Sequence, residues 1–313
     1  MAKTVVATAF GGPEVLTVVD EAVPDPAPGQ VQVRLRAVGV NPFDYKVYSG
    51  AVGADPANLP VRPGIEASGV VVAVGDDPVG PTGPIAVGDE VIVDPGTGTY
   101  TELITVPAAV TFAKPQNLTW EQAAALLSSG TTAVDALTTV RVAAGDTLLI
   151  HGASGSVGTA TAQLALARGA TVIGTARARN HEHLWALGVT AVEYGDGLEG
   201  RLRELAPDGV DAVVDTAGTD EAVDASLALV HDRDRVVTIL AFGRAERDGF
   251  HAIGANNPDS ARIRRAARLE IVELAGRGGL DVTVAKTFPL ADAARAHIEL
   301  QGDHPRGKFV LLP

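Results

Sequence analysis

The chain has 313 residues, of which 46% are hydrophobic and 20% charged, a balance that excludes a disordered protein. The formal net charge of −13 argues against nucleic-acid binding, since this surface would repel a phosphate backbone. The sequence contains no cysteine, which excludes disulfides, thiolate nucleophiles and cysteine-ligated metal sites. Without a signal-peptide core or an apolar run of roughly 18 residues, we expect a soluble cytoplasmic protein that does not bind membranes.

The first third of the chain has the pattern of short strands. Apolar and charged residues alternate over 31–38, as in a half-buried strand. Similar runs span residues 5–10, 16–20, 67–74, 90–94 and 100–106. Glycine and proline clusters separate these runs, which predicts a mostly antiparallel, barrel-like domain.

Near residue 118 the pattern changes to alternating strands and helices. Thr119 is a plausible N-cap for an Ala/Leu-rich helix. Strands are predicted over 147–151, 171–176, 210–215 and 235–242, with helices over 156–168, 182–187 and 220–230. This alternation predicts βαβ units and a parallel sheet.

The last segment contains helical runs over 259–277 and 291–300 and a strand-like run over 308–312. We expect this segment to return to the first domain. The predicted domains are therefore residues 1–118 with 257–313, and residues 119–256, in keeping with roughly 100–200 residues per domain.

The most informative stretch is the small-residue turn from Gly152 to Gly158, which joins a predicted strand to a predicted helix. Such a turn lets the backbone approach a diphosphate, and the amides and dipole at the helix start attract negative charge. Gly158 would allow the helix to lie close to the sheet. Residue 153 is alanine, so the strict G-x-G-x-x-G pattern is not met, but the strand–turn–helix context supports a dinucleotide site.

The end of the next strand indicates which dinucleotide would bind. An acidic residue expected there for NAD is replaced by Ala176, and Arg177 and Arg179 follow. A guanidinium can bind a 2′-phosphate through paired charge-assisted hydrogen bonds, which favours NADPH. The alternative is that both arginines are ordinary solvated loop charges.

With these residues in view, the chain resembles the zinc-free quinone oxidoreductase-like branch of the medium-chain dehydrogenase/reductase superfamily over nearly its whole length. The supporting segments are Gly39-Val40-Asn41-Pro42-Phe43-Asp44, Pro63-Gly64-Ile65-Glu66-Ala67-Ser68-Gly69, Val87-Gly88-Asp89-Glu90-Val91, Gly98-Thr99-Tyr100-Thr101-Glu102, Ser129-Gly130-Thr131-Thr132-Ala133, the glycine turn and Gly307-Lys308-Phe309-Val310. The resemblance implies an α/β protein with a Rossmann-type doubly wound parallel sheet domain and a GroES-like, mostly antiparallel β barrel domain. It also implies a homodimer joined through the cofactor domains near residues 235–242.

Zinc-dependent members of the superfamily place a cysteine at Asn41 and a histidine at Ile65, and this chain has neither. Glu66 remains, but a lone carboxylate cannot hold zinc. The Asn41-Pro42-Phe43-Asp44 run has the Asn-Pro-x-Asp pattern of the metal-free branch. The resemblance therefore implies zinc-independent chemistry.

The candidate catalytic residues lie on one segment. Asn41 stands where relatives carry a metal ligand and is the best polar candidate near the nicotinamide, although it could simply cap the loop before proline. Asp44, Tyr45 and Lys46 follow it. Tyr45 or Lys46 could donate a proton, as could solvent, and a structural or surface role stays open for each.

Several residues are candidates for contact with NADPH. Thr131 and Thr132 match the nicotinamide side of the family site. Tyr194 matches a position that reaches the 2′-phosphate, and the alternative is that it simply packs beside its strand. His151, before the turn, is interpreted as a core histidine with its hydrogen bonds satisfied. The cofactor-binding candidates are Thr131, Thr132, Ser154, Gly155, Ser156, Val157, Gly158, Thr175, Arg177, Arg179, Tyr194, Thr216, Ala241, Phe242 and Lys308.

The implied reaction is metal-free hydride transfer from NADPH to a small-molecule quinone or α,β-unsaturated carbonyl. One alternative is an enoyl or alkenal reductase of the same fold. Another is a redox-responsive NADPH-binding protein without catalytic activity. The sequence does not separate these functions.

Overall fold

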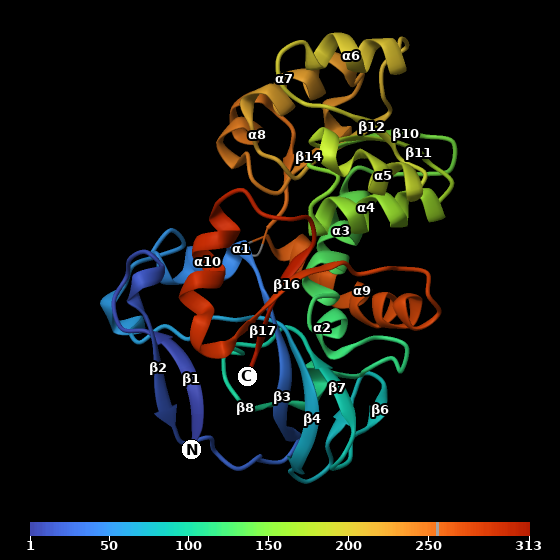
Figure 1. Cartoon of the computed structure of the whole chain (residues 1–313). Coiled ribbons are helices and arrows are strands. Elements are labelled where there is room, and N and C mark those ends of the chain that lie inside the picture. The colour runs from blue at the N-terminus through green and yellow to red at the C-terminus, as the bar shows by residue number, and fades with distance from the viewer. Residues whose placement is uncertain (255–256) are drawn as a thin grey trace. The chain divides into compact units, whose positions relative to one another are not determined.

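The computed structural model describes residues 1–254 and 257–313, which form two compact units (Figure 1). Residues 1–128 with 269–313 are the barrel unit, and residues 129–268 are the sheet unit. The boundary predicted after residue 118 precedes helix α2 (Trp120–Ala123), which belongs to the barrel unit. There Ser68 Oγ donates a hydrogen bond to the Trp120 carbonyl (2.7 Å). The boundary predicted after residue 256 falls outside the described residues.

The barrel unit contains a sheet with the strand order β16-β17-β3-β4-β7-β9, and β8 also pairs with β3. Only the β16–β17 pair of this sheet is parallel among the described residues. Its strands and those of two small hairpins are β1 (Ala2–Ala7), β2 (Leu16–Glu21), β3 (Gln30–Val40), β4 (Ala67–Val74), β5 (Val79–Gly80), β6 (Gly83–Pro84), β7 (Glu90–Val93), β8 (Leu103–Pro107), β9 (Thr111–Ala113), β16 (Val284–Pro289) and β17 (Lys308–Leu312). Besides α2, the unit holds helices α1 (Pro42–Tyr48) and α10 (Ala293–Gln301).

Strand β3 shows why the sequence builds this sheet. Val31, Val33 and Leu35 are buried in the core, whereas Arg34 and Arg36 between them are exposed. This alternation is the one predicted, and it places one face of the strand on the barrel core. Residues 37–41 are all buried, and β3 leads directly into α1 and the candidate catalytic segment.

The sheet unit is built on six parallel strands in the order β12-β11-β10-β13-β14-β15. The strands are β10 (Thr147–His151), β11 (Thr171–Thr175), β12 (Thr190–Val192), β13 (Ala212–Asp215), β14 (Val236–Thr238) and β15 (His251–Ala252). The helices are α4 (Ser156–Ala167), α5 (His181–Ala186), α6 (Leu198–Leu205), α7 (Asp220–Leu229) and α8 (Phe242–Asp248). Helices α3 (Leu127–Thr139) and α9 (Pro258–Gly276) run through the unit boundaries. The predicted doubly wound parallel sheet and antiparallel barrel are therefore confirmed.

One predicted strand is wrong in extent. Residues 235–242 were expected to form a single strand, but β14 ends at Thr238 and α8 begins at Phe242. The Thr238 hydroxyl accepts hydrogen bonds from the backbone N–H groups of Leu240 (3.1 Å) and Ala241 (2.9 Å). These bonds turn the backbone away from the sheet, although the sequence stays apolar.

None of the helices in the described part of the chain is both long enough and apolar enough to cross a membrane.

Candidate cofactor and catalytic sites

The sheet unit reverses its strand order between β10 and β13, and the predicted glycine turn follows β10 at that point. In open parallel sheets, ligands bind beyond the carboxyl ends of strands at such a switch point. Thr216, just after β13, donates its hydroxyl to the carbonyls of His151 (2.7 Å) and Gly152 (3.2 Å). Thr175, at the end of β11, accepts the N–H of Gly152 (3.3 Å). Both residues therefore hold the turn in place through their hydroxyl groups.

Helix α4 lies very close to the backbone of the turn that precedes it. A Cβ atom at Gly158 would lie 2.3 Å from the Gly152 carbonyl oxygen, so no larger residue fits there without movement. Gly152 has a φ of +73°, which favours glycine. The N-cap residue of α4, Gly155, has no side chain to cap the first turn. The amides at Ser156 and Val157 thus begin a 12-residue helix in a position suited to an anion.

A second polar group lies beyond β11 and β12. Arg177 donates its Nε hydrogen to the hydroxyl of Tyr194 at 2.6 Å, and both side chains are exposed. Asn180 Nδ2 donates to Ser154 Oγ (3.0 Å), which ties this loop to the glycine turn. Arg179 lies exposed on the same loop. The structure therefore brings together the arginine loop, Tyr194 and the glycine turn within one unit.

The remaining sheet-unit candidates lie at other positions. Ala241 is buried and Phe242 is about half exposed, just after β14. Asp215 connects this region to β13, because its Oδ2 accepts the Thr238 hydroxyl (2.7 Å) and its Oδ1 accepts the N–H groups of Ala217 and Gly218 (both 2.9 Å). Thr131 and Thr132 are buried in α3. Thr238 was not predicted as a site residue, although it is a polar residue at the carboxyl end of an apolar strand.

The barrel unit contains a buried polar cluster around Asn41, at the junction of β3 and α1. Asn41 Nδ2 donates to Glu66 Oε1 (3.1 Å), and Asn41 Oδ1 accepts from the Ser128 hydroxyl (3.1 Å) and from Lys308 Nζ. Lys308 Nζ also forms an ion pair with Glu66 Oε1 at 2.6 Å, and Glu66 Oε2 accepts the N–H of Ser128 at 3.0 Å. Lys308, a cofactor candidate, is thus engaged within this cluster. Glu66 was considered only as a carboxylate that cannot hold zinc alone. In the structure both of its oxygens accept hydrogen bonds.

Asp44 is linked to this cluster through the backbone of Asn41. Its Oδ2 accepts the N–H of Asn41 (2.8 Å) and the hydroxyl of Tyr100 (3.0 Å). The Tyr100 oxygen lies 2.9 Å from Nε2 of His297 in α10. Burial raises the pKa of the Asp44 carboxyl to about 7, despite the hydrogen bonds from Asn41 and Tyr100 that lower it. Burial also raises the pKa of Tyr100 well above its usual value and lowers that of His297 to about 4.

Tyr45 and Lys46 differ from Asp44 in exposure. Both side chains are half-buried in α1, so they keep some contact with solvent, whereas Asp44 is 1% exposed. The predicted catalytic candidates Asn41, Asp44, Tyr45 and Lys46 lie on one segment, at the start of α1. Tyr100 and His297 were not among them. Their only distinguishing feature is a polar side chain buried in an otherwise apolar core, which the sequence alone does not reveal.

His151 was interpreted as a core histidine with its hydrogen bonds satisfied, and that interpretation is only half right. The side chain is 1% exposed. Its Nδ1 lies 3.3 Å from Thr175 Oγ1, but its Nε2 has no hydrogen-bond partner within the described part of the chain. Burial lowers the pKa of His151 to about 4, so the ring stays neutral at physiological pH.

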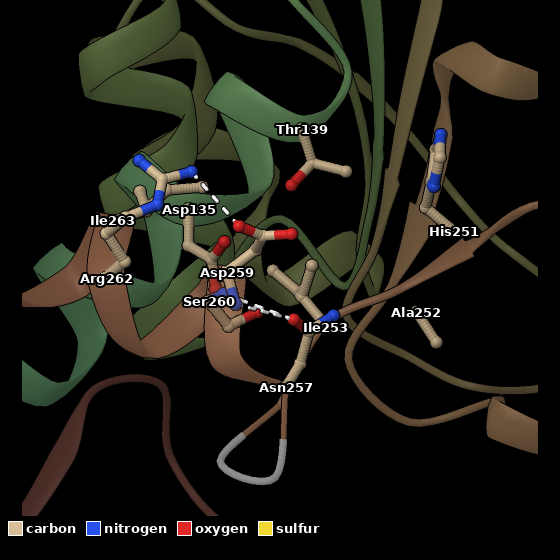
Figure 2. Close-up of a pocket in the computed structure, with 10 residues that line it drawn as sticks. All are labelled: Asp135, Thr139, His251, Ala252, Ile253, Asn257, Asp259, Ser260, Arg262 and Ile263. Atoms are coloured by element: carbon tan, nitrogen blue, oxygen red, sulfur yellow. Dashed lines mark hydrogen bonds and ion pairs between the residues drawn. The ribbon is translucent and has the colours of Figure 1, made fainter.

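Figure 2 shows a different pocket of the sheet unit, with a volume of about 290 Å³. It lies among α3, β15 and the start of α9, and no predicted site residue lines it. Asn257 Oδ1 accepts the N–H groups of Asp259 (2.9 Å) and Ser260 (3.4 Å) at its edge.

The donor set for a metal is sparse. Within residues 1–254 and 257–313, no three His, Asp or Glu side chains lie together in a way that could hold a metal ion. Glu66 already pairs with Lys308. The residues present therefore do not fit the cysteine- and histidine-based zinc sites of zinc-dependent relatives.

Comparison with known proteins gives matches to both units. The alcohol dehydrogenase GroES-like domain matches residues 27–116, and a domain described as a zinc-binding dehydrogenase matches residues 187–311. The synaptic vesicle membrane protein VAT-1 homolog of Mus musculus is 38% identical over 69% of this chain and 53% of its own length, so the chain spans about half of that relative.

Two matches extend over the full length. A quinone oxidoreductase of Pseudomonas aeruginosa is 32% identical over 100% of both chains. The solved structure of mycobacterial Rv1454c complexed with NADPH is 32% identical, covers 100% of both chains and has a TM-score of 0.83. The chain belongs to the quinone oxidoreductase branch of the medium-chain dehydrogenase/reductase superfamily of oxidoreductases.

Proposed function

We propose that this protein is an NADPH-dependent reductase that transfers hydride to a quinone or an α,β-unsaturated carbonyl compound without a metal ion. The observation that carries the proposal is the arrangement beyond strands β10, β11 and β12. There the glycine turn, the arginine loop and Tyr194 are joined by hydrogen bonds in one unit. A guanidinium and a hydroxyl beside a phosphate-binding turn suit a 2′-phosphorylated dinucleotide.

The sheet unit fits NADPH at two points. The close approach of Gly158 to Gly152, and a helix start without a capping side chain, suit the diphosphate. Arg177 and Tyr194 offer a guanidinium and a hydroxyl for the 2′-phosphate, and Arg179 can add a second charge. No carboxylate follows β11 before Glu182, so nothing on that loop repels the phosphate.

When bound, reduced nicotinamide supplies the hydride, and the protein contributes binding, orientation and polarisation. Quinone reduction adds two electrons as hydride and ends with two protonated oxygens. Enone reduction places hydride on the β-carbon, and the enolate then takes a proton. The amide group of Asn41 would orient the substrate or the nicotinamide. Tyr45 and Lys46, which are half-buried, could each donate a proton to the reduced product. The predicted contact of Lys308 with the cofactor stays a prediction, since its amine also neutralises Glu66.

Two other functions remain open for test. An enoyl or alkenal reductase would use the same cofactor with a different acceptor, whereas a non-catalytic redox-responsive protein would bind NADPH without turnover. A panel of quinones, enones and enoyl thioesters, assayed by NADPH oxidation, separates them. We expect turnover with a quinone or simple enone that survives prolonged chelation. Saturable NADPH binding without turnover would favour the binding protein, and a loss restored by zinc would refute the metal-free mechanism.

A further inference from the structure

A continuous hydrogen-bonded chain crosses the barrel unit from α10 to α1. It runs from His297 through Tyr100 to Asp44 and then to the backbone of Asn41. The first three side chains are 0%, 0% and 1% exposed. His297 lies 197 positions after Tyr100 in the sequence, and Asp44 lies 56 positions before it. The hydrogen bonds thus connect distant parts of the sequence inside the buried core.

The numbers of donors and acceptors on these side chains give the hydrogen-bonded chain a direction. Tyr100 has one hydroxyl proton, which it donates to Asp44 Oδ2 when that carboxyl is ionised. Its oxygen must then accept the bond with His297, so Nε2 of His297 carries the proton. Burial keeps His297 neutral above about pH 4. The histidine therefore acts as a neutral donor that orients the tyrosine hydroxyl.

Asn41 connects this hydrogen-bonded chain to the buried polar cluster described above. Asp44 holds its backbone N–H, while its side-chain amide contacts Glu66, Ser128 and Lys308. A change in the ionisation of the Asp44 carboxyl therefore affects the position of the Asn41 amide group, which we propose to orient substrate or cofactor. Asp44 Oδ1 and His297 Nδ1 have no hydrogen-bond partner within the described part of the chain. The Tyr100 hydroxyl is therefore the hydrogen-bond partner of His297 Nε2 and one of the two donors to Asp44 Oδ2, beside the Asn41 N–H.

We propose that Tyr100 and His297 are positioning residues of the reductase: they act through ionised Asp44 to fix Asn41 in its working orientation. This inference rests on the proposed function only for the role of Asn41, because the chain itself is a feature of the barrel unit. Loss of the Tyr100 donor removes one of two hydrogen bonds that stabilise the Asp44 carboxylate. The carboxyl then protonates at higher pH, and its neutral form accepts the Asn41 N–H more weakly than the carboxylate does.

Other groups around Asp44 must be included in any pH argument. Lys308 lowers the pKa of Asp44, whereas Glu66 raises it. Tyr48, one helical turn after Asp44, packs its ring edge-on against His297 with centroids 5.3 Å apart. Burial and the Asp44 charge raise the pKa of Tyr48, so it stays neutral. Tyr100 is the side chain that donates a hydrogen bond to Asp44 within the described residues.

The test compares two tyrosine-to-phenylalanine variants. Tyr100→Phe removes the donor to Asp44, whereas Tyr48→Phe removes a buried hydroxyl without a hydrogen-bond partner in the described residues, beside the same histidine. At neutral pH we expect Tyr100→Phe to lower kcat about tenfold, with recovery toward pH 9, and to leave the KM for NADPH unchanged. Tyr48→Phe should keep the original pH profile. A pH-independent loss in Tyr100→Phe, or equal shifts in both variants, would overturn the proposal.

A second measurement does not need enzymatic activity. Amide hydrogen exchange at Asn41 should speed up about tenfold in Tyr100→Phe near neutral pH and stay unchanged in Tyr48→Phe. His297→Gln keeps an N–H donor, so the Asn41 amide should exchange more slowly in this variant than in His297→Leu. Unchanged exchange in Tyr100→Phe would refute the positioning chain even if the protein proves active. Faster exchange in a protein without reductase activity would support the chain and refute the proposed function.

Discussion

Gly158 shows how a single missing side chain sets the geometry of the cofactor turn. Its Cβ would lie 2.3 Å from the Gly152 carbonyl oxygen, whereas a Cβ at Gly155 would lie 3.4 Å from the same atom. We expect Gly158→Ala to lower the free energy of unfolding by about 1–3 kcal/mol, since backbone must move. Gly155→Ala is the control and should cost at most about 1 kcal/mol. Chemical denaturation measures both, and equal losses would contradict the proposed close packing.

Asp44 makes stability depend on pH in a defined direction. Its pKa of about 7 in the folded state exceeds the usual value of 3.8, so the folded state binds more protons between these limits. Its stabilising contribution is complete below about pH 4 and falls as pH rises to about 7, by up to about 1.4 kcal/mol per unit. The two buried histidines act in the opposite sense, because their stabilising contribution is lost as pH falls from 6.5 to about 4.

The Asp44→Asn variant isolates the carboxyl from these histidines. We expect the unfolding free energy of the original protein, minus that of the variant, to decrease from about pH 4 to pH 7 and then to level off. Urea denaturation at several pH values provides the difference. A difference that is constant across this range would show that Asp44 titrates at an ordinary pKa.

At the scale of elements, the turn after β14 depends on one hydroxyl group. Thr238 donates to Asp215 and accepts the N–H groups of Leu240 and Ala241. We expect Thr238→Val to destabilise the protein by about 1–3 kcal/mol, because a buried carboxylate oxygen loses its donor. Thr238→Ser keeps the hydroxyl and should lose less than half as much stability. Similar melting temperatures for the two variants would be inconsistent with this role.

The sequence predicted those elements whose pattern is local. The strands at 67–74, 147–151 and 308–312 have the predicted bounds, because apolar runs there end at clear turn residues. Helix α6 was missed, since its eight residues bury only Leu198 and Leu202. The glycine turn and arginine loop could be found from spacing along the chain. The Asp44–Tyr100–His297 chain could not, because its members meet only through the tertiary fold.

At the scale of the whole molecule, assembly is predicted from the family resemblance. The homodimer was expected to form through the cofactor domains near residues 235–242. Strand β14 lies between β13 and β15, and β15 is at the edge of this sheet, so a partner that extended the sheet would pair with β15. Light scattering at micromolar concentration should give about twice 32.0 kDa. A mass near 32.0 kDa would exclude the dimer under those conditions.

The preference between NADPH and NADH tests most directly whether the arginine loop binds a 2′-phosphate. Arg177 and Tyr194 form an exposed pair, so solvent screening limits each contact, but even about 1.4 kcal/mol corresponds to tenfold in affinity. The decisive measurement is kcat/KM for NADPH and for NADH with the same quinone, in the original protein and in the Arg177→Ala, Arg179→Ala double variant. We predict a preference for NADPH of at least about tenfold that disappears in the double variant while NADH is nearly unaffected. Equal values for the two cofactors in the original protein would contradict the proposed binding of NADPH by this loop.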